Sequence, residues 1–496
     1  MPKESRNCLA AGLDDIDKLE GFLNRIQFVE MRLDLDLSPQ NLKKAERVIP
    51  FIRERGLEII ATCRRVEDRG GFTGSESERL ALLKWAIERG ATILDLEVGS
   101  EAESLLHYKN PECRKILSYH NFKCVPDGIE SIAETMILKG AWLYKIVCKA
   151  NRYDDNIKLL DLNGYFSSRG QDSTCFGLGE KCLYSRAFLT ARDGKMNFYG
   201  FPEKTTAPGQ FTTNDRELYQ LDSVNEMTEC FGVIGNPVSH SLSPSIHNTL
   251  LGIYSLNAVF LPFHVDDIEE FMEFAKRNEI NGLAVTYPWK DERFYVHIAR
   301  IEESVKKFSS GNTLFVKNGE FVMADTDYNG FAEFFAEKIH RKPGRAVIIG
   351  TGNTGKKIVG YLKERGWIIT LISRRPEDRR ITLGAQYMIE DYSLLASVEC
   401  DLLINATPVG AFSGDDWKKL FPKKTPADMI VVDINYRQNA DPFLNSGVFD
   451  KNRKYDGLDM LVNQAVMQFQ IWTGISVEAK SRRLLYRKLK LPNGRF

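Results

Sequence analysis

Short apolar runs alternate with longer amphipathic segments throughout the first half of the chain. Runs of about 4–8 apolar residues bounded by polar turns are typical of buried strands, and their alternation with helical segments is typical of parallel β/α units. Eight strands are predicted, at residues 8–12, 28–33, 58–63, 92–98, 115–119, 142–148, 173–177 and 196–201. Eight such units need about 200–250 residues to form a (β/α)8 TIM barrel. We therefore expect an α/β fold that begins with a barrel over residues 1–222.

A polar stretch at residues 212–229 leads from this barrel into a second alternating region. A strand is predicted at 230–235. Another at 346–349 runs into the glycine-rich sequence GTGNTG at 350–355 and a helical segment at 356–365. Strand, glycine loop and helix in this order are typical of a Rossmann dinucleotide-binding domain, which we place at residues 332–455. Residues 230–331, completed by 456–496, are expected to form the remaining α/β domain.

The glycine loop predicts where a dinucleotide would bind. Gly350 permits the tight turn, Gly352 lets the backbone approach a pyrophosphate, and Gly355 lets helix and strand pack closely. Asn353 and Thr354 share the loop at the amide end of the helix, where phosphates bind, so we count them among the cofactor-binding residues. An ordinary glycine-rich turn is the alternative.

The next strand, predicted at 367–372, indicates which dinucleotide to expect. It ends in Ser373, Arg374 and Arg375 rather than in an acidic residue. A carboxylate there would hold the ribose of NAD but repel the 2′-phosphate of NADP, whereas a guanidinium can bind that phosphate. The sequence therefore predicts NADP (NADPH), with Arg374 as the main contact and Ser373 and Arg375 beside it. Two arginines on a solvated loop are the alternative.

Composition narrows the class of partner. The 496 residues suffice for about three compact units. Lys+Arg and Asp+Glu both number 67, so no net charge draws the chain onto nucleic acid or a membrane, and small molecules are the expected partners. No apolar run approaches the roughly 18 residues of a membrane span, and the first residues turn polar too soon for a signal or transit peptide. A cytoplasmic protein is expected. The nine cysteines show no CxxC spacing, which favours reduced thiols over disulfides or a metal site.

Reactive side chains gather at the predicted carboxyl ends of the barrel strands, where barrel enzymes carry their chemistry. Lys145 lies inside an apolar strand, and desolvation there favours the neutral, nucleophilic amine that forms a Schiff base with a ketone. His120 ends the preceding strand and could move a proton beside that imine. A lysine that extends to the rim and a histidine satisfied in the core are the alternatives.

Further charged residues share these strand ends. We expect the carboxylates of Glu30 and Glu97 to orient the imidazole, and the guanidinium groups of Arg32, Arg64 and Arg186 to hold a carboxylate substrate. Each residue alone is a weak indication; their common position at one rim carries the argument.

The motifs of this half, taken in order, resemble type I 3-dehydroquinate dehydratase across roughly residues 5–215. They are EMRLD at 30–34, SYHNF at 118–122, Lys145-Ile146, Gly179-Glu180, Ser185-Arg186 and TAPGQ at 206–210. The resemblance implies a (β/α)8 barrel that removes water from 3-dehydroquinate, with Lys145 forming the imine and His120 transferring the proton. The implied substrate-binding residues are Glu30, Arg32, Arg64, Arg186, Thr206 and Gln210.

Two departures from that family pattern stand out. Thr206 takes the place of a usual serine, which keeps the hydroxyl but crowds the pocket. The segment after Arg64 is one residue longer than usual, so the acidic role of this loop is open between Glu67 and Asp68.

The second half offers hydroxyls and one charged pair. The segment NPVSHSLSP at 236–244 reads as a loop, and Ser241 and Ser243, two residues apart in an extended segment, can offer hydroxyls to a polyol from one side. Lys290 and Asp327 offer a cation and a carboxylate that could share the proton that follows a hydride. A plain serine-rich turn and unrelated surface ion pairs are the alternatives.

Together with the glycine loop, these segments resemble shikimate dehydrogenase across about residues 230–496. Further matches are GLAVTYPWK at 282–290, GNT at 311–313, ADTDYNG at 324–330, NATP at 405–408, DINY at 433–436 and MLVNQA at 460–465. The resemblance implies that Lys290 is the principal proton donor with Asp327 as its partner, and that Thr407 lies at the cofactor. The implied residues at shikimate or 3-dehydroshikimate are Ser241, Ser243, Thr286, Asn312, Tyr436 and Gln464.

This half also departs from its family at three positions. Many members have asparagine where Ala284 and Asp325 stand, and glycine where Asp459 stands. Asp325 and Asp459 add negative charge, which leaves the detail of substrate binding open.

The two resemblances support each other, because the expected product of the first reaction is the substrate of the second. We predict a bifunctional enzyme that converts 3-dehydroquinate to 3-dehydroshikimate and then to shikimate with NADPH, similar to the fused enzymes of plants and some bacteria. One alternative is a fused quinate/shikimate dehydrogenase that uses NAD. The other is a barrel that has lost catalysis and serves the reductase as a regulatory or ligand-binding module.

Overall fold

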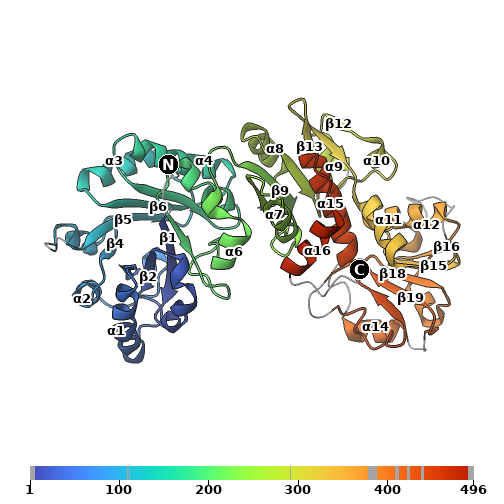
Figure 1. The fold of residues 1–496 in the computed structure, drawn as a ribbon, viewed down its shortest axis with the longest axis horizontal. Helices are drawn as coiled ribbons and strands as arrows, with labels where there is room; N and C mark the ends of the chain where they lie inside the picture. The colour runs from blue at the N-terminus through green and yellow to red at the C-terminus, as the bar shows by residue number, and fades with distance from the viewer. Residues whose placement is uncertain are drawn as a thin grey trace. The chain divides into compact units, whose positions relative to one another are not determined.

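The structure is a computed structural model that describes residues 6–108, 110, 112–290, 292–377, 388–407, 413–421, 425–436 and 441–489. By its internal contacts the chain divides into two compact units. The first is Met1–Phe231 with Ser255–Ile280, and the second is Gly232–Tyr254 with Asn281–Phe496. In Figure 1 the colour runs along the chain from the blue barrel strands to the red C-terminal helices.

The first unit contains the predicted barrel. Its strands are β1 (Arg6–Gly12), β2 (Phe28–Arg32), β3 (Glu58–Thr62), β4 (Ile93–Glu97), β5 (Arg114–Asn121), β6 (Leu143–Lys149), β7 (Ser173–Leu178) and β8 (Met196–Tyr199), so all eight predicted strands are confirmed. They follow the order β7-β6-β5-β4-β3-β2-β1-β8. At the seam, Lys195 N donates to Ser173 O at 2.9 Å and Thr174 Oγ1 donates to Met196 O at 2.7 Å, which joins β7 to β8.

Helices connect these strands around the barrel. They are η1 (Ile16–Arg25), α1 (Pro39–Glu54), η2 (Val66–Asp68), α2 (Glu76–Glu88), η3 (Glu101–His107), α3 (Ile129–Lys139), α4 (Asp154–Ser167), α5 (Leu183–Ala187), η4 (Thr190–Arg192), α6 (Thr213–Leu218) and η5 (Leu221–Ser223). The connections after β1 and β4 are 3-10 helices rather than α-helices. A capping box at Ser75 fixes the start of α2, because Ser75 and Glu78 satisfy each other's backbone amides.

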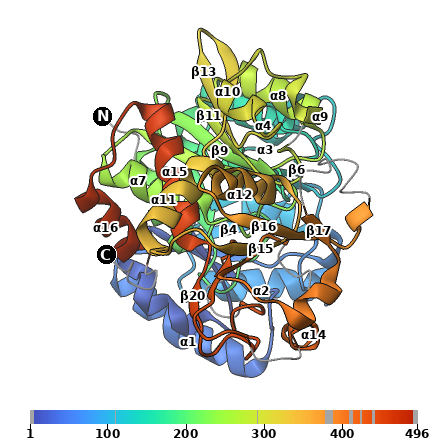
Figure 2. The same cartoon turned by 90° about the vertical axis from the view of Figure 1, so that its right-hand side faces the viewer.

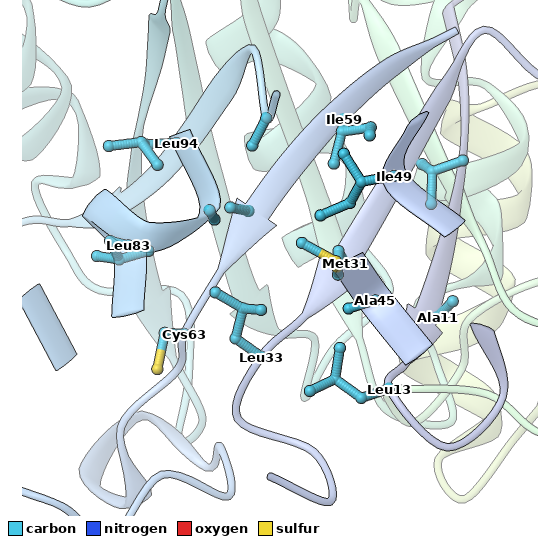
Figure 3. Close-up of a cluster of buried hydrophobic side chains, with 14 of the residues drawn as sticks. Ala11, Leu13, Met31, Leu33, Ala45, Ile49, Ile59, Cys63, Leu83 and Leu94 are labelled. Atoms are coloured by element: carbon cyan, nitrogen blue, oxygen red, sulfur yellow. The ribbon is translucent and has the colours of Figure 1, made fainter. Parts of the chain in front are cut away.

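Alternation along the strands decides which side chains reach the barrel interior. Met31 and Ile59 point outward and pack against Ala45 and Ile49 of α1 in the core shown in Figure 3. Successive residues of a strand face opposite sides. The residues next to these outward positions, Glu30 among them, therefore face inward. On β6 the same pattern packs Tyr144 and Ile146 against the helices and turns Lys145 inward.

A six-stranded mixed sheet follows the barrel in sequence. Its strands are β9 (Glu229–Gly235), β10 (Ala258–His264), β11 (Gly282–Val285), β12 (Arg300–Ile301), β13 (Thr313–Lys317) and β14 (Glu320–Ala324), in the order β10-β9-β11-β13-β14-β12. Its helices are α7 (Ser243–Ile253), α8 (Ile268–Arg277), α9 (Glu292–Tyr295), α10 (Glu303–Lys306) and α11 (Asp327–Lys338), joined from the C-terminus by α15 (Leu458–Thr473) and α16 (Ala479–Lys488). Helix α15 packs beside α11 and α7 (Figure 1).

The last sheet is parallel throughout. Its strands are β15 (Arg345–Ile349), β16 (Ile368–Ile372), β17 (Met388–Glu390), β18 (Leu402–Asn405), β19 (Ile430–Asp433) and β20 (Arg453–Tyr455), with α12 (Asn353–Glu364), η6 (Tyr392–Ser397) and α14 (Gly414–Leu420) between them. The order β17-β16-β15-β18-β19-β20 reads 3-2-1-4-5-6 along the chain, the order of a Rossmann fold. Helix α12 begins at Asn353, three residues before the predicted start, and lies beside α11 and β15 (Figure 2).

Candidate active sites

The barrel cavity opens at the carboxyl ends of the strands. The eight residues predicted to catalyse the reaction or bind substrate on this half all line it: Glu30, Arg32, Arg64, His120, Lys145, Arg186, Thr206 and Gln210. Glu97, expected to orient the imidazole, is not among the residues that line it. They come from β2, the loop after β3, β5, β6, the short helix after β7 and the loop after β8. The fold therefore brings residues that are up to 180 positions apart in sequence to one cavity.

Lys145 lies deep in this cavity with two carboxylates beside its amine. Its Nζ is 3.0 Å from Asp95 Oδ2 and 3.4 Å from Glu30 Oε1, and it lies 3.9 Å above the ring of Phe198. From its apolar strand, the amine was expected in apolar surroundings, and Asp95 was not predicted to lie beside it. A usable signal was present, because Asp95 stands two residues before Glu97 in an apolar strand, on the same face.

The surroundings of His120 favour the neutral form of its imidazole. Burial, and then the cations of Arg64 and Lys145, lower the pKa of His120 well below its ordinary value. Its Nδ1 lies 3.4 Å from Arg64 Nη1, and its ring stacks on Phe122 with centroids 6.0 Å apart. A neutral imidazole in this position can accept a proton.

The two glutamates expected to orient this imidazole bond elsewhere. Glu30 accepts from Thr62 Oγ1 at 2.9 Å and lies beside Lys145. Glu97 accepts from Arg64 at 2.9 Å and from the fully buried Arg79 at 2.6 Å. Among the described residues, the hydrogen-bond partners of the two carboxylates are thus Thr62 and three cations rather than the imidazole, contrary to the expectation. Glu97 holds Arg64, and Arg64 lies next to the imidazole.

Burial would raise the pKa of Asp95, but Arg64 and Lys145 outweigh it and hold that pKa far below its usual range. Asp95 Oδ1 also accepts from Ser118 Oγ at 2.6 Å. An ionised carboxylate shared by two cations thus lies behind the cavity lining.

The two remaining arginines differ in how their charge is balanced. Arg32 makes a two-point contact with Asp34, at 2.9 and 2.7 Å. Arg186 donates from Nε to Gly177 O at 3.0 Å and stacks over Phe176. In the part of the chain that the structure describes, no carboxylate lies within ion-pair distance of Arg186, and burial lowers its pKa. A buried arginine without a carboxylate partner beside a cavity is suited to binding an anion.

Two loops complete the cavity. After β8, the backbone N and Oγ1 of Thr206 donate to Gln210 Oε1 at 2.8 and 3.1 Å, so these two predicted residues hold each other in place. After β3, Asp68 lines the cavity and accepts from Arg65 at 2.7 Å, whereas Glu67 is exposed. The location favours Asp68 as the acidic residue of this loop.

A second cavity lies within the second unit. Its lining includes most of the residues predicted for this half, namely Ser241, Ser243, Thr286, Lys290, Asp327, Tyr436, Gln464 and Thr354 of the glycine loop. Ser241 precedes α7, Lys290 follows β11, and Asp327 is the first residue of α11. Burial raises the pKa of Tyr436, whose ring lies beside Ser241 and the Leu242 backbone.

Lys290 and Asp327 form the predicted pair, with 2.8 Å between Nζ and Oδ2. Asn312 does not line the cavity; its Nδ2 donates to Asp327 Oδ1 at 2.8 Å and to Gln464 Oε1 at 2.6 Å, which fixes two residues that do. Burial would raise the pKa of Asp327, but the ammonium groups of Lys290 and Lys357 hold it far below its usual range. The carboxylate is therefore ionised.

Gln468, which was not predicted from the sequence, also lines this cavity. Its Nε2 donates to Asn312 O at 3.0 Å and to Thr313 Oγ1 at 3.1 Å. It follows Gln464 by four residues on α15, and this helical spacing was the signal that could have identified it.

The three departures from the family pattern add no charge to the cavity wall. Ala284 lines the cavity without a polar group. Asp325 is buried, is not among the residues that line the cavity, and forms an ion pair with Lys357. Asp459 accepts from Tyr486 Oη at 2.6 Å and lies 3.4 Å from Lys338.

The glycine loop fits a dinucleotide phosphate. Gly350 has φ 105°, and a Cβ there would lie 2.7 Å from Ala406 O. A Cβ at Gly355 would lie 2.7 Å from Gly350 O, whereas one at Gly352 would meet nothing within 4 Å. The loop is thus tightly packed toward the sheet and open at Gly352 toward a ligand, at the amide end of α12.

Neighbouring strand ends carry the other residues predicted at the cofactor. Thr407, after β18, bonds through its hydroxyl to Asn405 Oδ1 at 2.7 Å; Pro408 of the same motif lies outside the described residues. Ser373 follows β16 and is buried, while Arg374 and Arg375 are exposed. These ends flank β15, where the strand order reverses, the usual dinucleotide position in such sheets.

Comparisons with known proteins agree with both halves. Residues 9–226 match the family described as type I 3-dehydroquinase, residues 233–314 the shikimate dehydrogenase substrate binding domain, and residues 457–481 the shikimate 5′-dehydrogenase C-terminal domain. The chloroplastic bifunctional 3-dehydroquinate dehydratase/shikimate dehydrogenase of Arabidopsis thaliana is 25% identical over 94% of this chain and 82% of its own length. The shikimate dehydrogenase (NADP(+)) of Pyrococcus abyssi is 32% identical over 51% of this chain and 95% of its own length.

Proposed function

The chain belongs to the type I 3-dehydroquinase and shikimate dehydrogenase families, joined in one polypeptide, and we propose that it converts 3-dehydroquinate to 3-dehydroshikimate and then to shikimate with NADPH. One observation carries the proposal. Lys145 and His120 line one cavity, while Lys290 and Asp327 line another that includes Thr354 of the glycine loop. Each cavity holds the groups that one of the two reactions requires.

In the barrel we assign Lys145 as the nucleophile. Its amine attacks the ketone carbon, the carbonyl oxygen leaves as water, and the resulting protonated imine can accept an electron pair from the neighbouring carbon. Asp95 and Glu30 lie beside this amine. Asp95 stays ionised and balances its charge, and Glu30 can take up the proton that the amine must lose. The two neighbouring carboxylates explain why a charged lysine can be buried here before it reacts.

His120 is assigned the proton transfer. It removes the proton from the carbon next to the imine, and the electron pair of that C–H bond moves into the imine. The hydroxyl on the next carbon then leaves as water with the proton that His120 carries. Hydrolysis of the imine releases 3-dehydroshikimate and restores Lys145.

Arg186 is the best anchor for the substrate carboxylate, because its buried guanidinium faces no carboxylate of the described chain. Arg32 and Arg64 also bind the substrate in this proposal. Their charges are already paired with Asp34, Asp95 and Glu97, so they stabilise the pocket as well. The remaining binding residues on this half are Glu30, Thr206 and Gln210.

In the second cavity, bound NADPH supplies the hydride that reduces the carbonyl carbon. Lys290 is assigned as the donor of the proton that the carbonyl oxygen gains, and Asp327 holds its ammonium group in place. The residues assigned to the hydroxyl and carboxylate groups of 3-dehydroshikimate are Ser241, Ser243, Thr286, Tyr436 and Gln464, with Asn312 behind them.

The choice of NADPH rests on the residues around the glycine loop. Gly350, Gly352 and Gly355 shape the loop, and Arg374 and Arg375 extend from the next strand end. Asn353, Thr354 and Thr407 are assigned to the pyrophosphate side, and Ser373 with the two arginines to the 2′-phosphate. The printed names of relatives such as the Pyrococcus abyssi enzyme support this choice.

The division into 1–222, 230–331 with 456–496, and 332–455 is also part of the proposal, as is a cytoplasmic location. Among the described residues, no helix is long and apolar enough to span a bilayer.

A panel of substrates and coenzymes tests the proposal. Dehydration of 3-dehydroquinate is followed by the absorbance of the enone product, and reduction of 3-dehydroshikimate by the loss of NADPH. We expect both activities, with NADPH far preferred to NADH. A chain that instead oxidises quinate with NAD, or whose barrel binds 3-dehydroquinate without dehydrating it, would refute the assignment.

A further inference from the structure

One face of α12 lies against the residues that carry the proposed reduction. Asn353, Lys357, Gly360 and Glu364 follow the spacing i, i+4, i+7, i+11 and so share a side of the helix. Asn353 Nδ2 donates to Lys290 O at 3.2 Å. At the far end, Glu364 bonds to Lys307 and to the hydroxyl of Tyr328, and a Cβ at Gly360 would lie 2.5 Å from the ring of Phe308.

Lys357 is the central residue of this face and the most deeply buried. Its side chain is 1% exposed, and its Nζ lies 3.1 Å from Asp327 Oδ2 and also bonds to Asp325. Lys290 contacts the same oxygen, Asp327 Oδ2, at 2.8 Å. One carboxylate oxygen thus accepts hydrogen bonds from two ammonium groups.

The two lysines differ in access to the cavity. Lys290 lines the cavity and its side chain is 22% exposed, whereas Lys357 is not part of the lining. Lys290 can reach a substrate; Lys357 can act only through Asp327. The two ammonium groups and the two carboxylates balance one another. Because these groups are largely removed from water, removal of any one of them leaves an uncompensated charge.

The directions in which the surroundings shift the two pKa values agree with this arrangement. Burial opposes the charge on Lys357, but Asp327 and Asp325 outweigh it and raise the pKa of Lys357. Burial raises the pKa of Asp325, against the effect of Lys357. The charged groups that face Asp327 are Lys290 from the loop after β11, Lys357 from α12 and Asp325 from the end of β14.

We propose that Lys357 is a positioning residue of the reductase: it fixes the Asp327 carboxylate that holds Lys290, and it ties this pair to the helix whose amide end receives the dinucleotide. The inference rests on the proposed reduction. It also gives Asp325 a role, because that carboxylate balances the second buried cation without placing charge on the cavity wall.

The competing explanation is that Lys357 only neutralises Asp325. Four proteins separate the two: the wild type, Lys357→Met, Asp325→Asn and the double variant. Lys357→Met alone leaves the buried Asp325 carboxylate without its cation, so the thermal unfolding midpoint of this variant should fall. The double variant with Asp325→Asn no longer has that carboxylate and should recover much of the lost stability. Lys480→Met, on an exposed position of α16, is the control and should behave as wild type.

Kinetics decide between the explanations. If Lys357 positions Asp327, the double variant recovers stability but keeps a kcat for 3-dehydroshikimate reduction about tenfold or more below wild type, the effect of one unit of pKa coupling. KM should change by less than about threefold, since the loss lies outside the cavity lining. The acid limb of kcat should move to higher pH, because Asp327 then keeps only Lys290 to oppose its burial.

A stable double variant with wild-type kcat and an unchanged pH profile would overturn the inference and leave Lys357 as a counter-ion of Asp325. A wild-type chain that fails to reduce 3-dehydroshikimate would contradict the proposed function, and the inference with it. An active wild type with a slow, stable double variant would support both.

Discussion

Lys145 and His120 come from neighbouring strands, yet each depends on charged neighbours that lie far away in sequence. Lys145 is held by Asp95 and Glu30, and His120 is kept neutral by burial beside Arg64. A nucleophilic amine and a neutral base are what dehydration through an imine requires. At the scale of single residues, the chemistry is set by which ionised groups share the cavity.

Replacement of the nucleophile gives the clearest residue-scale prediction. Lys145→Ala should abolish dehydration, because no other described lysine lines the barrel cavity to form the imine. Borohydride added with 3-dehydroquinate should attach the substrate to Lys145, as read by peptide mass spectrometry. Lys158→Ala, on the exposed side of α4, is the control and should retain full activity and labelling. Undiminished dehydration by Lys145→Ala would contradict the assignment.

The pH dependence of dehydration follows from His120. Its pKa is lowered in the folded protein, so the neutral, proton-accepting form persists at pH values below the ordinary histidine pKa of about 6.5. We expect kcat/KM for 3-dehydroquinate to stay level as the pH falls from 8 to about 6.5, with any loss due to His120 only at lower pH. An acid limb centred near pH 7, matched by an NMR titration of the His120 imidazole with the same midpoint, would show that the imidazole is not shielded in this way.

At the scale of elements, strands and helices place these groups by regular geometry. The alternation of β2 and β6 turns Glu30 and Lys145 inward, and the spacing of α15 brings Gln464 and Gln468 to one side. The 3-2-1-4-5-6 order brings the glycine loop beside the end of β18. Periodicity was therefore enough to predict the strands and the fold class, whereas many of the polar residues that line the two cavities came from the motifs that resemble the two families.

Other features lay beyond periodicity. A charge in the helices of Arg79 and Lys357 is usually solvated, and Asp95 lies in an apolar strand. All three side chains are nevertheless buried, because a charged partner from elsewhere in the chain neutralises each of them. Those partners are 18 to 50 residues away, and no local pattern pairs them. The 3-10 helices after β1 and β4 were likewise unforeseen, since their sequences also fit an α-helix.

The glycine loop yields an element-scale prediction from a matched pair of substitutions. Gly355→Ala should lower the unfolding midpoint of the protein without ligand, because its Cβ would meet the Gly350 carbonyl. Gly352→Ala should leave that midpoint unchanged, since its Cβ has open space, but should weaken NADPH binding about tenfold or more by blocking close approach of the pyrophosphate. Thermal unfolding and a fluorescence titration with NADPH measure the two effects. Equal NADPH affinity for Gly352→Ala and wild type would argue against phosphate binding at this loop.

At the scale of the whole molecule, the chain joins two cavities whose proposed reactions are consecutive. The product of the barrel is the substrate of the second cavity, and covalent linkage raises the local concentration of one site near the other. Each cavity is formed within its own compact unit, so each activity should survive loss of the other. Lys145→Ala should therefore still reduce added 3-dehydroshikimate, and Lys290→Ala should still dehydrate 3-dehydroquinate.

The most direct test of the whole account is a single assay in which the purified chain receives only 3-dehydroquinate and NADPH. Enone absorbance and NADPH absorbance are followed together, and the product is identified by chromatography. The account predicts a transient rise of the enone, consumption of NADPH and formation of shikimate. An enone that accumulates without loss of NADPH, or NADPH that is consumed without any enone or shikimate, would contradict it.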